Sequence, residues 1–340
     1  MKVSLIANLG ILFFFKYSQF LVENIDHVLG KMGVPFSIRY QSPELPLGLS
    51  FHTFQSMAYT IDIFLGRVAP EGSLGVYALY VLFFPQLVAG PIERPGSMLP
   101  QLRKLSGAKP AEMVLGLRWM LLGFTKKLLI ADNLGVFVDR VYSAPETARG
   151  PWMILATYFF AFQIYCDFSG YADIAVGTAK FFGIDLVQNF NRPYLSVSVR
   201  EFWRRWHISL SSWFRDYLFK PLGGSQRGRW IQVRNIMIVF CLSGLWHGAS
   251  WNFVIWGAIN GFFVAGETLL SSTPLGRLRL PRVFRWIYTF HVICFSWVFF
   301  RADTFEHALL LIRGTTRNWP FQLDQLPTMV GMMRSSFFVS

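Results

Sequence analysis

The sequence predicts an all-α, polytopic integral membrane protein built as a multi-helix bundle. Hydrophobic residues make up 53% of the 340-residue chain and aromatic residues 17%, whereas charged residues fall to 15%, well below the roughly 25% usual in soluble domains. Several apolar stretches are long enough to cross a bilayer. The basic residues behind the net charge of +13 lie between these stretches, which favours cytoplasmic anchors and anion sites over a nucleic-acid surface.

The candidate membrane spans follow from length. A helix rises about 1.5 Å per residue and needs about 20 apolar residues to cross the hydrocarbon core. In chain order the candidates are Val3–Val22, Leu74–Ile92, Met113–Ala131, Trp152–Phe168, Ile236–Gly266 and Val283–Phe300. No small-residue cleavage site follows the first one after a short apolar core, so we interpret it as a retained anchor rather than a signal peptide.

Two apolar segments depart from a simple span. Leu45–Leu65 is interrupted by polar residues, including Gln55 and Asp62, which predicts a re-entrant or interior helix surrounded by protein or water. Ile236–Gly266 is too long for one untilted crossing. We expect it to break near Gly244 and Gly248, where the absence of a side chain allows backbones to approach closely.

A single histidine, His247, lies inside Ile236–Gly266, a run without any Asp, Glu, Lys or Arg. An ionisable group within hydrocarbon is costly and therefore indicates a functional site. The alternative is a histidine that hydrogen-bonds a neighbouring helix and serves only packing. A break beside His247 would expose backbone groups to a cavity, as at many membrane binding sites.

The loop from Arg192 to Arg234 carries nine Lys or Arg residues and two acids, and the positive-inside rule assigns it to the cytoplasm. Within it, Arg200–Tyr217 has a helical period. The apolar face comprises Phe202, Trp206, Leu210, Trp213 and Tyr217, and the polar face comprises Arg200, Arg204, His207, Ser211 and Arg215. We predict an amphipathic helix at the cytoplasmic boundary, ending near Pro221. It either anchors the chain on lipid phosphates or docks a phosphate-bearing cofactor.

A third polar cluster, Gln163–Asp173, places Asp167 and Asp173 at the end of an apolar span, where a solvated helix terminus is expected. Cys166 beside Asp167 is weak evidence for a nucleophile. The three cysteines are spaced for neither a disulfide nor a metal, so they are interpreted as buried packing residues. The sequence contains no Gly-rich phosphate loop and no HExxH motif, and we expect no metal site and no permanently bound cofactor.

Five ordered motifs together resemble the membrane-bound O-acyltransferase family, and most closely its bacterial alginate O-acetylation branch. They are Phe84–Arg94, Gln163–Asp173, Asn189–Tyr194, Phe202–Tyr217 and Leu245–Asn252. The resemblance implies an all-helical, multi-span fold with a transbilayer tunnel that an acyl donor enters from the cytoplasm. Relatives usually carry further spans at both ends, so the 340 residues are interpreted as one family domain that lacks them.

The resemblance also implies site residues. The histidine of the Trp-His-Gly motif is the family's near-invariant catalytic residue and corresponds to His247, and the histidine of the Trp-Arg-Arg-Trp-His motif corresponds to His207. We assign substrate binding to residues in and around these motifs: Arg204, Arg205, Arg215, Asp216, Trp246 and Asn252. Burial keeps an imidazole neutral, so His247 is expected to act as the general base toward an attacking hydroxyl. The role of His207 stays open.

The predicted reaction is transfer of an acetyl group from cytoplasmic acetyl-CoA, in a bacterial inner membrane, for O-acetylation of an exported, alginate-like polysaccharide. Exported polymer lies beyond a hydrocarbon core of about 30 Å, and the chain has no Gly-x-Ser-x-Gly motif for acting on it outside. A secreted or periplasmic acetyltransferase partner is therefore expected. The alternatives are D-alanyl transfer toward teichoic acid, a lipid or substrate translocator, and a scaffold for a secretion complex.

Overall fold

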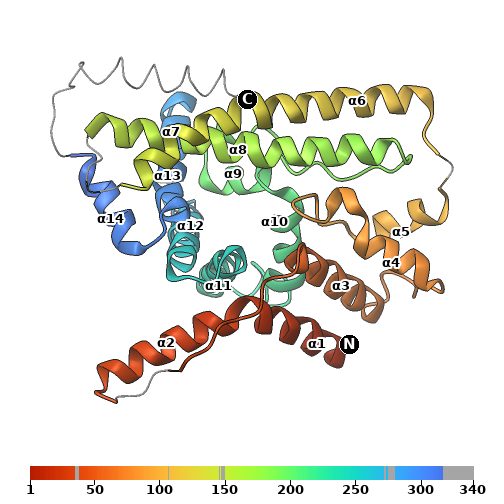
Figure 1. Ribbon diagram of the computed structural model, residues 1–340, viewed down its shortest axis with the longest axis horizontal. Helices are drawn as coiled ribbons and strands as arrows, with labels where there is room; N and C mark the ends of the chain where they lie inside the picture. Colours follow the sequence, from red (N-terminus) through yellow and green to blue (C-terminus); the bar gives the residue numbers. More distant parts are fainter. Residues whose placement is uncertain are drawn as a thin grey trace.

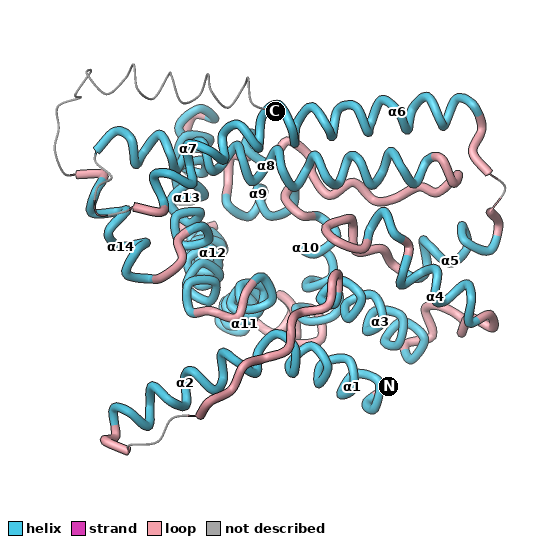
Figure 2. The backbone as a smooth tube through the Cα atoms, in the orientation of Figure 1, coloured by secondary structure: helices cyan, strands magenta, loops and turns pink. Residues whose placement is uncertain are grey.

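The computed structural model describes residues 1–34, 38–105, 107–144, 146, 150–271, 273–274 and 280–316. Within these ranges the chain forms helices joined by loops and contains no strand (Figures 1 and 2), which confirms the all-α prediction. The indistinct stretch Phe321–Ser340 lies outside them. The α-helices are α1 Lys2–Leu12, α2 Ser18–Lys31, α3 Leu49–Phe64, α4 Leu74–Leu82, α5 Pro95–Arg103, α6 Pro110–Phe124, α7 Asp132–Tyr142, α8 Gly150–Lys180, α9 Val199–Arg205, α10 Ile208–Phe214, α11 Arg229–His247, α12 Trp251–Leu270, α13 Arg282–Arg301 and α14 Phe305–Gly314. The π-helical turns are η1 Phe13–Tyr17, η3 Thr125–Ala131 and η5 Arg215–Phe219, and the 3-10 turns are η2 Phe84–Gln86 and η4 Pro193–Leu195.

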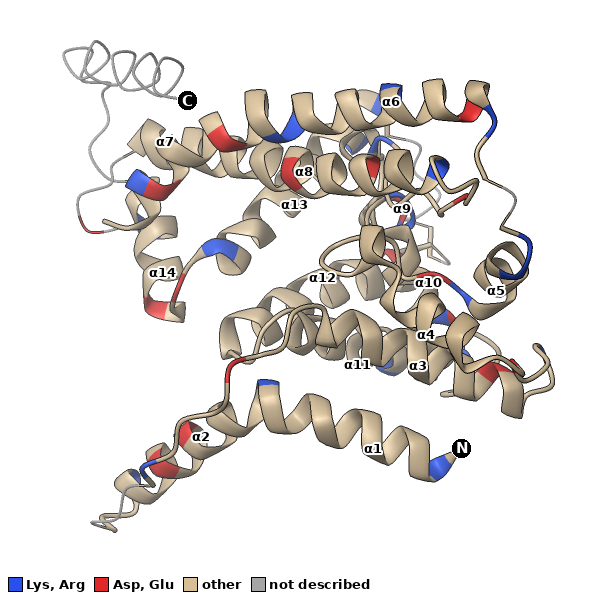
Figure 3. Cartoon of the chain, turned by 45° about the vertical axis from the view of Figure 1, so that its right-hand side comes forward, with Lys and Arg blue, Asp and Glu red and all other residues tan. Residues whose placement is uncertain are grey.

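Three helices in the described part of the chain are long and apolar enough to cross a membrane: Lys2–Lys31, Trp251–Leu270 and Arg282–Arg301. The first joins α1 and α2 through η1 and includes the predicted span Val3–Val22. The last matches the predicted span Val283–Phe300. Figure 3 shows that α12 carries almost no charged residue along its length. The membrane setting predicted from composition is thus supported by individual helices.

Helix α8 is longer than the predicted span Trp152–Phe168, because it continues to Lys180. It packs lengthwise against the continuous helix formed by α6, η3 and α7 (Figure 1). The prediction of a solvated helix end at Gln163–Asp173 is therefore wrong. Asp167 lies within the helix, is half exposed and accepts a hydrogen bond from Lys127 Nζ at 2.6 Å, and Asp173 pairs with Lys126 at 2.5 Å.

The predicted span Leu74–Ile92 is wrong. Helix α4 ends at Leu82, and Phe83 leaves the helical conformation with a ψ of 105°. A 3-10 turn that contains Pro85 follows, since proline cannot donate the backbone hydrogen bond that would continue an α-helix. A helix of 9 residues covers only about 14 Å at the usual rise. This segment therefore does not cross a bilayer as one helix.

Helix α3 confirms the interior alternative for Leu45–Leu65. Its polar side chains Gln55 and Asp62 are buried, and Asp62 accepts a hydrogen bond from Tyr217 Oη at 2.8 Å. Asp62 also pairs with Arg67 at 3.0 Å. A buried carboxylate is tolerated when it is paired and hydrogen-bonded. Whether α3 enters the membrane as a re-entrant helix stays a prediction.

Helices α11 and α12 form an antiparallel hairpin, and the predicted break in Ile236–Gly266 is confirmed. The chain turns at Gly248, whose extended conformation ends α11 directly after His247. Gly244, the other glycine of the predicted break, lies within α11, where a Cβ atom would fall 2.0 Å from the carbonyl oxygen of Phe253 in α12. This close backbone contact places the end of α11 relative to α12.

An aromatic core connects α8, α9, α12 and α13 behind this hairpin. Phe202 and Trp206 stack with ring centroids 5.4 Å apart, and Trp256 stacks on Trp297 at 5.8 Å. Offset-stacked and edge-to-face aromatic pairs add specific geometry to apolar burial. The core therefore holds the short helix α9 rigidly beside α12 and α13.

Candidate active site

The segment Arg200–Tyr217 is broken in the middle, so the prediction of one amphipathic helix at the membrane surface is wrong. Helix α9 ends at Arg205 and α10 begins at Ile208. Between them His207 adopts a left-handed conformation with φ 44° and ψ 57°, which costs a non-glycine residue about 1–3 kcal/mol. Such strain persists only where surrounding contacts enforce it. The predicted end near Pro221 is confirmed, since η5 stops at Phe219.

Hydrogen bonds from two other motifs enforce the break at His207. The carbonyl oxygen of Asn189 accepts from Ile208 N at 2.9 Å, and its side-chain Oδ1 accepts from Ser209 N at 3.2 Å. Ser209 Oγ in turn accepts from Ile92 N at 3.0 Å. The first backbone donors of α10 are thus satisfied by a loop rather than by a preceding helical turn. This is why the helical period of the sequence does not continue through His207.

His207 is 2% exposed, and neither ring nitrogen has a hydrogen-bond partner. Its ring meets the edge of Phe168 from α8, with centroids 4.6 Å apart. A buried polar group without a partner costs about 1–3 kcal/mol. Unsatisfied groups of this kind in a folded protein call for an explanation, such as a catalytic or binding role.

His247 is the last residue of α11 and is surrounded by aromatic rings. The ring centroids of Trp246, Trp256 and Phe300 lie 5.0, 5.2 and 5.3 Å from its own. No hydrogen bond from a described residue reaches its imidazole. The alternative of a histidine satisfied by a neighbouring helix therefore lacks support, and the ring is free to exchange a proton with a bound molecule.

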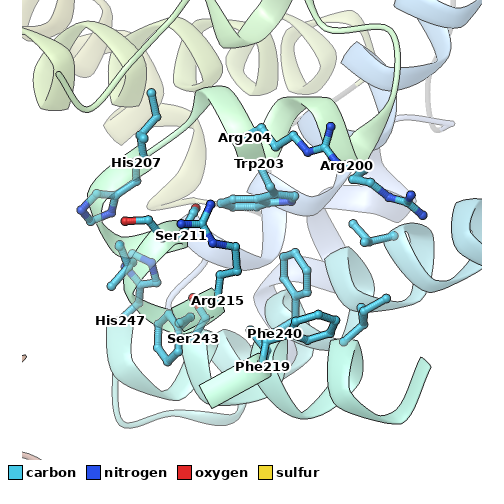
Figure 4. Close-up of a pocket in the computed structure, with 17 residues that line it drawn as sticks. Arg200, Trp203, Arg204, His207, Ser211, Arg215, Phe219, Phe240, Ser243 and His247 are labelled. Carbon is cyan, nitrogen blue, oxygen red and sulfur yellow. The ribbon is translucent and has the colours of Figure 1, made fainter. Parts of the chain in front are cut away.

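His207 and His247 both line two separate cavities, each with a volume of about 540 Å³. We call them the arginine cavity and the aromatic cavity. Figure 4 shows the arginine cavity, with the two histidines at one end and Arg200 at the other. Because both histidines line both cavities, a molecule in the arginine cavity and a molecule in the aromatic cavity can reach the same imidazoles.

The arginine cavity contains the polar face predicted from the helical period. Its polar lining comprises Arg200, Arg204, His207, Ser211, Ser212, Arg215, Ser243 and His247, with no carboxylate among its lining residues. The predicted face therefore points inward rather than toward lipid. Arg200 is anchored by a hydrogen bond from Nη2 to Thr268 Oγ1 on α12. Three guanidinium groups around one cavity suit an anionic ligand that carries phosphates.

Arg215 reaches the arginine cavity from a fixed position, because Asp216 accepts two hydrogen bonds from its guanidinium at 3.0 Å each. Arg94 and Lys220 also pair with Asp216, at 3.3 and 2.8 Å. Burial alone would raise the pKa of this carboxyl, but hydrogen bonds from Arg215 and Lys220 outweigh it and lower the pKa to about 2. Three cations against one carboxylate leave the cluster with excess positive charge.

The aromatic cavity lies on the other side of the two histidines. Its aromatic lining comprises Phe51, Phe168, Tyr171, Trp206, Trp246, Trp256, Trp297 and Phe300, and its charged lining comprises Lys16, Lys127 and Asp167. Lys127 is bridged between Asp132 and Asp167 at 2.8 and 2.6 Å. Lys16 comes from the N-terminal helix. This cavity is thus largely apolar and has charged groups only at a few positions, as is typical of sites for small or chain-like ligands.

The structure brings together some of the predicted site residues and separates others. Trp246 lines the aromatic cavity, whereas Arg205, Asp216 and Asn252 line neither cavity. Arg205 pairs with Glu201 on the same helix at 2.5 Å. Asn252 is buried and donates from Nδ2 to the carbonyl oxygen of Ala302 at 2.8 Å. Their assignment to substrate binding stays a prediction.

Lys16 is a site residue that the sequence analysis missed. It is the only charged residue inside the predicted span Val3–Val22, and an ionisable residue within a membrane span indicates function by default. The same signal that pointed to His247, an ionisable residue within an apolar span, therefore also points to Lys16.

Two cysteines differ from their sequence-based interpretation or play no part in the site. Cys166, considered as a nucleophile, is buried and lines neither cavity. Cys241 is only partly buried, in contrast to its interpretation as a core residue.

The sequence as a whole decides which family this architecture represents. A model of the membrane-bound O-acyltransferase family matches residues 72–304. The chain belongs to the membrane-bound O-acyltransferase family. The match contains both histidines and all five motifs, whereas Lys16 precedes it.

Individual members of the family give more detail. The chain is 36% identical over 327 residues to a protein of Pseudomonas aeruginosa named probable alginate O-acetylase, covering 95% of this chain and 61% of that protein. It is 36% identical to a peptidoglycan O-acetyltransferase of Helicobacter pylori, covering 92% of this chain and 63% of the relative. It is 28% identical to a teichoic acid D-alanyltransferase of Bacillus subtilis, covering 77% and 70%. The chain thus spans about three-fifths of the length of the first two relatives.

Proposed function

We propose that this chain is a membrane O-acyltransferase that moves an acetyl group from cytoplasmic acetyl-CoA across a bacterial inner membrane, in which it is a multi-pass protein. The acetyl group is destined for O-acetylation of an exported, alginate-like polysaccharide. The observation that carries the proposal is that His207 and His247 line both cavities. A donor in one cavity and an acceptor in the other can then meet at the same two side chains.

The donor is assigned to the arginine cavity because of its charge. Arg200, Arg204 and Arg215 line it without any lining carboxylate, which suits the phosphates of acetyl-CoA. The basic loop that holds these residues is on the cytoplasmic side by the positive-inside rule. The acyl arm of the donor then extends away from the arginines toward His247.

His247 acts as the general base in the proposed acyl transfer. The imidazole accepts the proton of an acceptor hydroxyl while the hydroxyl oxygen attacks the carbonyl carbon of the thioester. The carbonyl π electrons move onto its oxygen and return as the carbon–sulfur bond breaks. The leaving thiolate takes the proton back from His247, so acetyl ester and free thiol are the products. His207, buried and unpartnered, supplies a second polar group at this point.

The molecule whose hydroxyl attacks the thioester is assigned to the aromatic cavity. The acetyl group ends on the polysaccharide outside the membrane. The hydrocarbon core between cytoplasmic donor and exported polymer is about 30 Å thick. A secreted or periplasmic acetyltransferase partner therefore takes the acetyl group from this chain and completes the transfer. The names of the relatives from Pseudomonas aeruginosa and Helicobacter pylori support acetylation of a polysaccharide of the cell envelope.

The test uses proteoliposomes that contain the full chain and enclose radiolabelled acetyl-CoA. External alginate should gain little label until a periplasmic extract that contains the partner is added. His247→Gln should lower the transfer rate by roughly 10²–10⁴-fold, the usual contribution of a general base, and His207→Gln should also lower it. His27→Gln, at an exposed position on α2, is the matched control. Transfer by His247→Gln at the rate of the control would refute the assignment of the base, and efficient polymer acetylation without extract would refute the relay.

D-alanyl transfer toward teichoic acid is the second candidate, and the similarity to the Bacillus subtilis teichoic acid D-alanyltransferase favours it. That reaction would take a D-alanyl thioester in place of acetyl-CoA. Competition between the two donors for the same proteoliposomes separates the candidates. Label transferred from the D-alanyl donor but not from acetyl-CoA would replace the first proposal by the second.

A further inference from the structure

The N-terminal helix Lys2–Lys31 is interrupted by the π-helical turn η1 in the middle of a membrane-spanning stretch. Turns of this kind in α-helices frequently occur at functional sites, because the extra residue redirects neighbouring side chains. Lys16 and Tyr17 are the last two residues of η1. Both side chains point toward α11, as their hydrogen bonds show.

The two side chains bind consecutive carbonyl groups at the end of α11. Tyr17 Oη donates to the carbonyl oxygen of Leu245 at 3.0 Å. Lys16 Nζ donates to the carbonyl oxygen of Trp246 and also to Ser50 Oγ, the latter at 3.3 Å. The last carbonyls of a helix have no partner within it. Lys16 and Tyr17 thus satisfy the carbonyls of the two residues that directly precede His247.

We propose that Lys16 and Tyr17 are positioning residues that clamp the last turn of α11 and thereby hold His247 in place between the two cavities. This inference rests on the proposed acyl transfer, in which His247 is the base. The clamp lies outside residues 72–304, the part that matches the family model. The N-terminal helix would then be part of the active site rather than a simple anchor.

Electrostatics favours the same assignment. A lysine in an apolar segment is costly unless its charge is compensated. The C-terminal end of a helix carries partial negative charge and attracts cations. The ammonium group of Lys16 meets this end of α11 and lies 5.5 Å from the ring centroid of Trp246, within the range of a cation–π interaction. The carbonyl oxygen and the ring of Trp246, the residue before His247, therefore compensate the positive charge of Lys16.

The position of Lys16 also predicts which kinetic constant depends on it. Lys16 lines the aromatic cavity together with His247 but does not line the arginine cavity. Loss of the clamp should misplace His247 without moving the arginines that bind the phosphates of the donor. The turnover number kcat should therefore fall, whereas KM for acetyl-CoA should stay the same. General destabilisation of the fold would instead change the amount of active protein and spare kcat per folded molecule.

The experiment compares Lys16→Met, Lys16→Arg and Tyr17→Phe in the full chain in proteoliposomes, with acetyl-CoA as the probe. Lys31→Met makes the same substitution at an exposed position of the same helix and is the control. Lys16→Met should lower kcat by about 10²-fold, the usual effect of displacing a catalytic group by about 1 Å. Tyr17→Phe should lower it by about 10-fold, as expected for loss of one neutral hydrogen bond. Lys16→Arg keeps a cationic donor and should recover most of the loss.

Hydrogen–deuterium exchange tests the clamp without relying on activity. Backbone amides of residues 243–250 should exchange faster in Lys16→Met and Tyr17→Phe than in the wild type and in Lys31→Met. If the wild type transfers no acetyl group, the proposed function fails while this measurement still decides on the clamp. Unchanged exchange in Lys16→Met, or a raised KM with unchanged kcat, would overturn the inference.

Discussion

Replacing Gly244 by alanine is the sharpest test of how α11 positions His247. A Cβ atom at this position would lie 2.0 Å from the carbonyl oxygen of Phe253 and 2.9 Å from its carbonyl carbon. Both atoms belong to the backbone of α12, so no flexible side chain can move aside. The first separation is about 1.4 Å shorter than the 3.4 Å at which ordinary contact begins. The two helices of the hairpin must therefore move apart by about that distance.

The displacement acts on stability and on catalysis. Overpacking of this kind usually costs about 1–3 kcal/mol of folding free energy. His247 follows Gly244 by less than one helical turn, so it moves with the displaced segment. A misplacement of about 1 Å at a reacting group lowers the rate by about 10²-fold. We therefore expect Gly244→Ala to lose both thermal stability and most of its acyl transfer.

Gly266→Ala is the matched control, because it lies in α12 with no atom within 4 Å of its Cβ position. This substitution should stabilise the helix by about 0.5–1 kcal/mol and leave transfer unchanged. Thermal unfolding in detergent and the rate of acetyl transfer in proteoliposomes measure both effects. Equal stability and equal transfer rates for Gly244→Ala and the wild type would refute the close-packed hairpin as the element that positions His247.

Three further predictions concern charge and topology. A cysteine introduced at Gln226 should react with impermeant thiol reagents only after the inner membrane is opened, because the positive-inside rule predicts a cytoplasmic basic loop; labelling of intact spheroplasts would contradict this prediction. Arg215→Gln should raise KM for acetyl-CoA by about 10–100-fold through loss of a charge-assisted contact, whereas Arg103→Gln, at an arginine that pairs with Glu71 and lines neither cavity, should not; equal KM values for the two variants would exclude Arg215 as a donor ligand. Burial raises the pKa of Glu93 from its ordinary value of 4.5 to about 7, so the folded protein keeps a proton that the unfolded chain releases. The contribution of Glu93 to the free energy of unfolding should therefore be fully present below pH 4.5 and be lost as the pH rises through about 7. The melting temperature of Glu93→Gln should lack this decrease, and an identical pH dependence of the two proteins would contradict the prediction.

The helical character of the chain and the grouping of its polar face could be predicted from the sequence alone, whereas the inward direction of that face could not. Composition and apolar length predict membrane helices, because burial in lipid requires both. The helical period of Arg200–Tyr217 correctly groups Arg200, Arg204, His207, Ser211 and Arg215 on one side, and all five line one cavity. The helical period of a sequence predicts which residues share one face of a helix. It does not report whether that face meets lipid, solvent or the interior of the protein.

What the sequence could not predict depends on partners that are distant in the chain. The break at His207 exists because Asn189 accepts hydrogen bonds from the backbone N–H groups of Ile208 and Ser209, which a continuous helix would have used internally. The contact of Lys16 with the end of α11 joins residues 230 positions apart. Local pattern carries no information on such hydrogen bonds, because packing of whole helices decides which donors and acceptors meet. The sequence by itself thus determined the helical membrane character of the chain and pointed to the two histidines, and only the tertiary structure decided where each helix ends and that these histidines lie between two cavities.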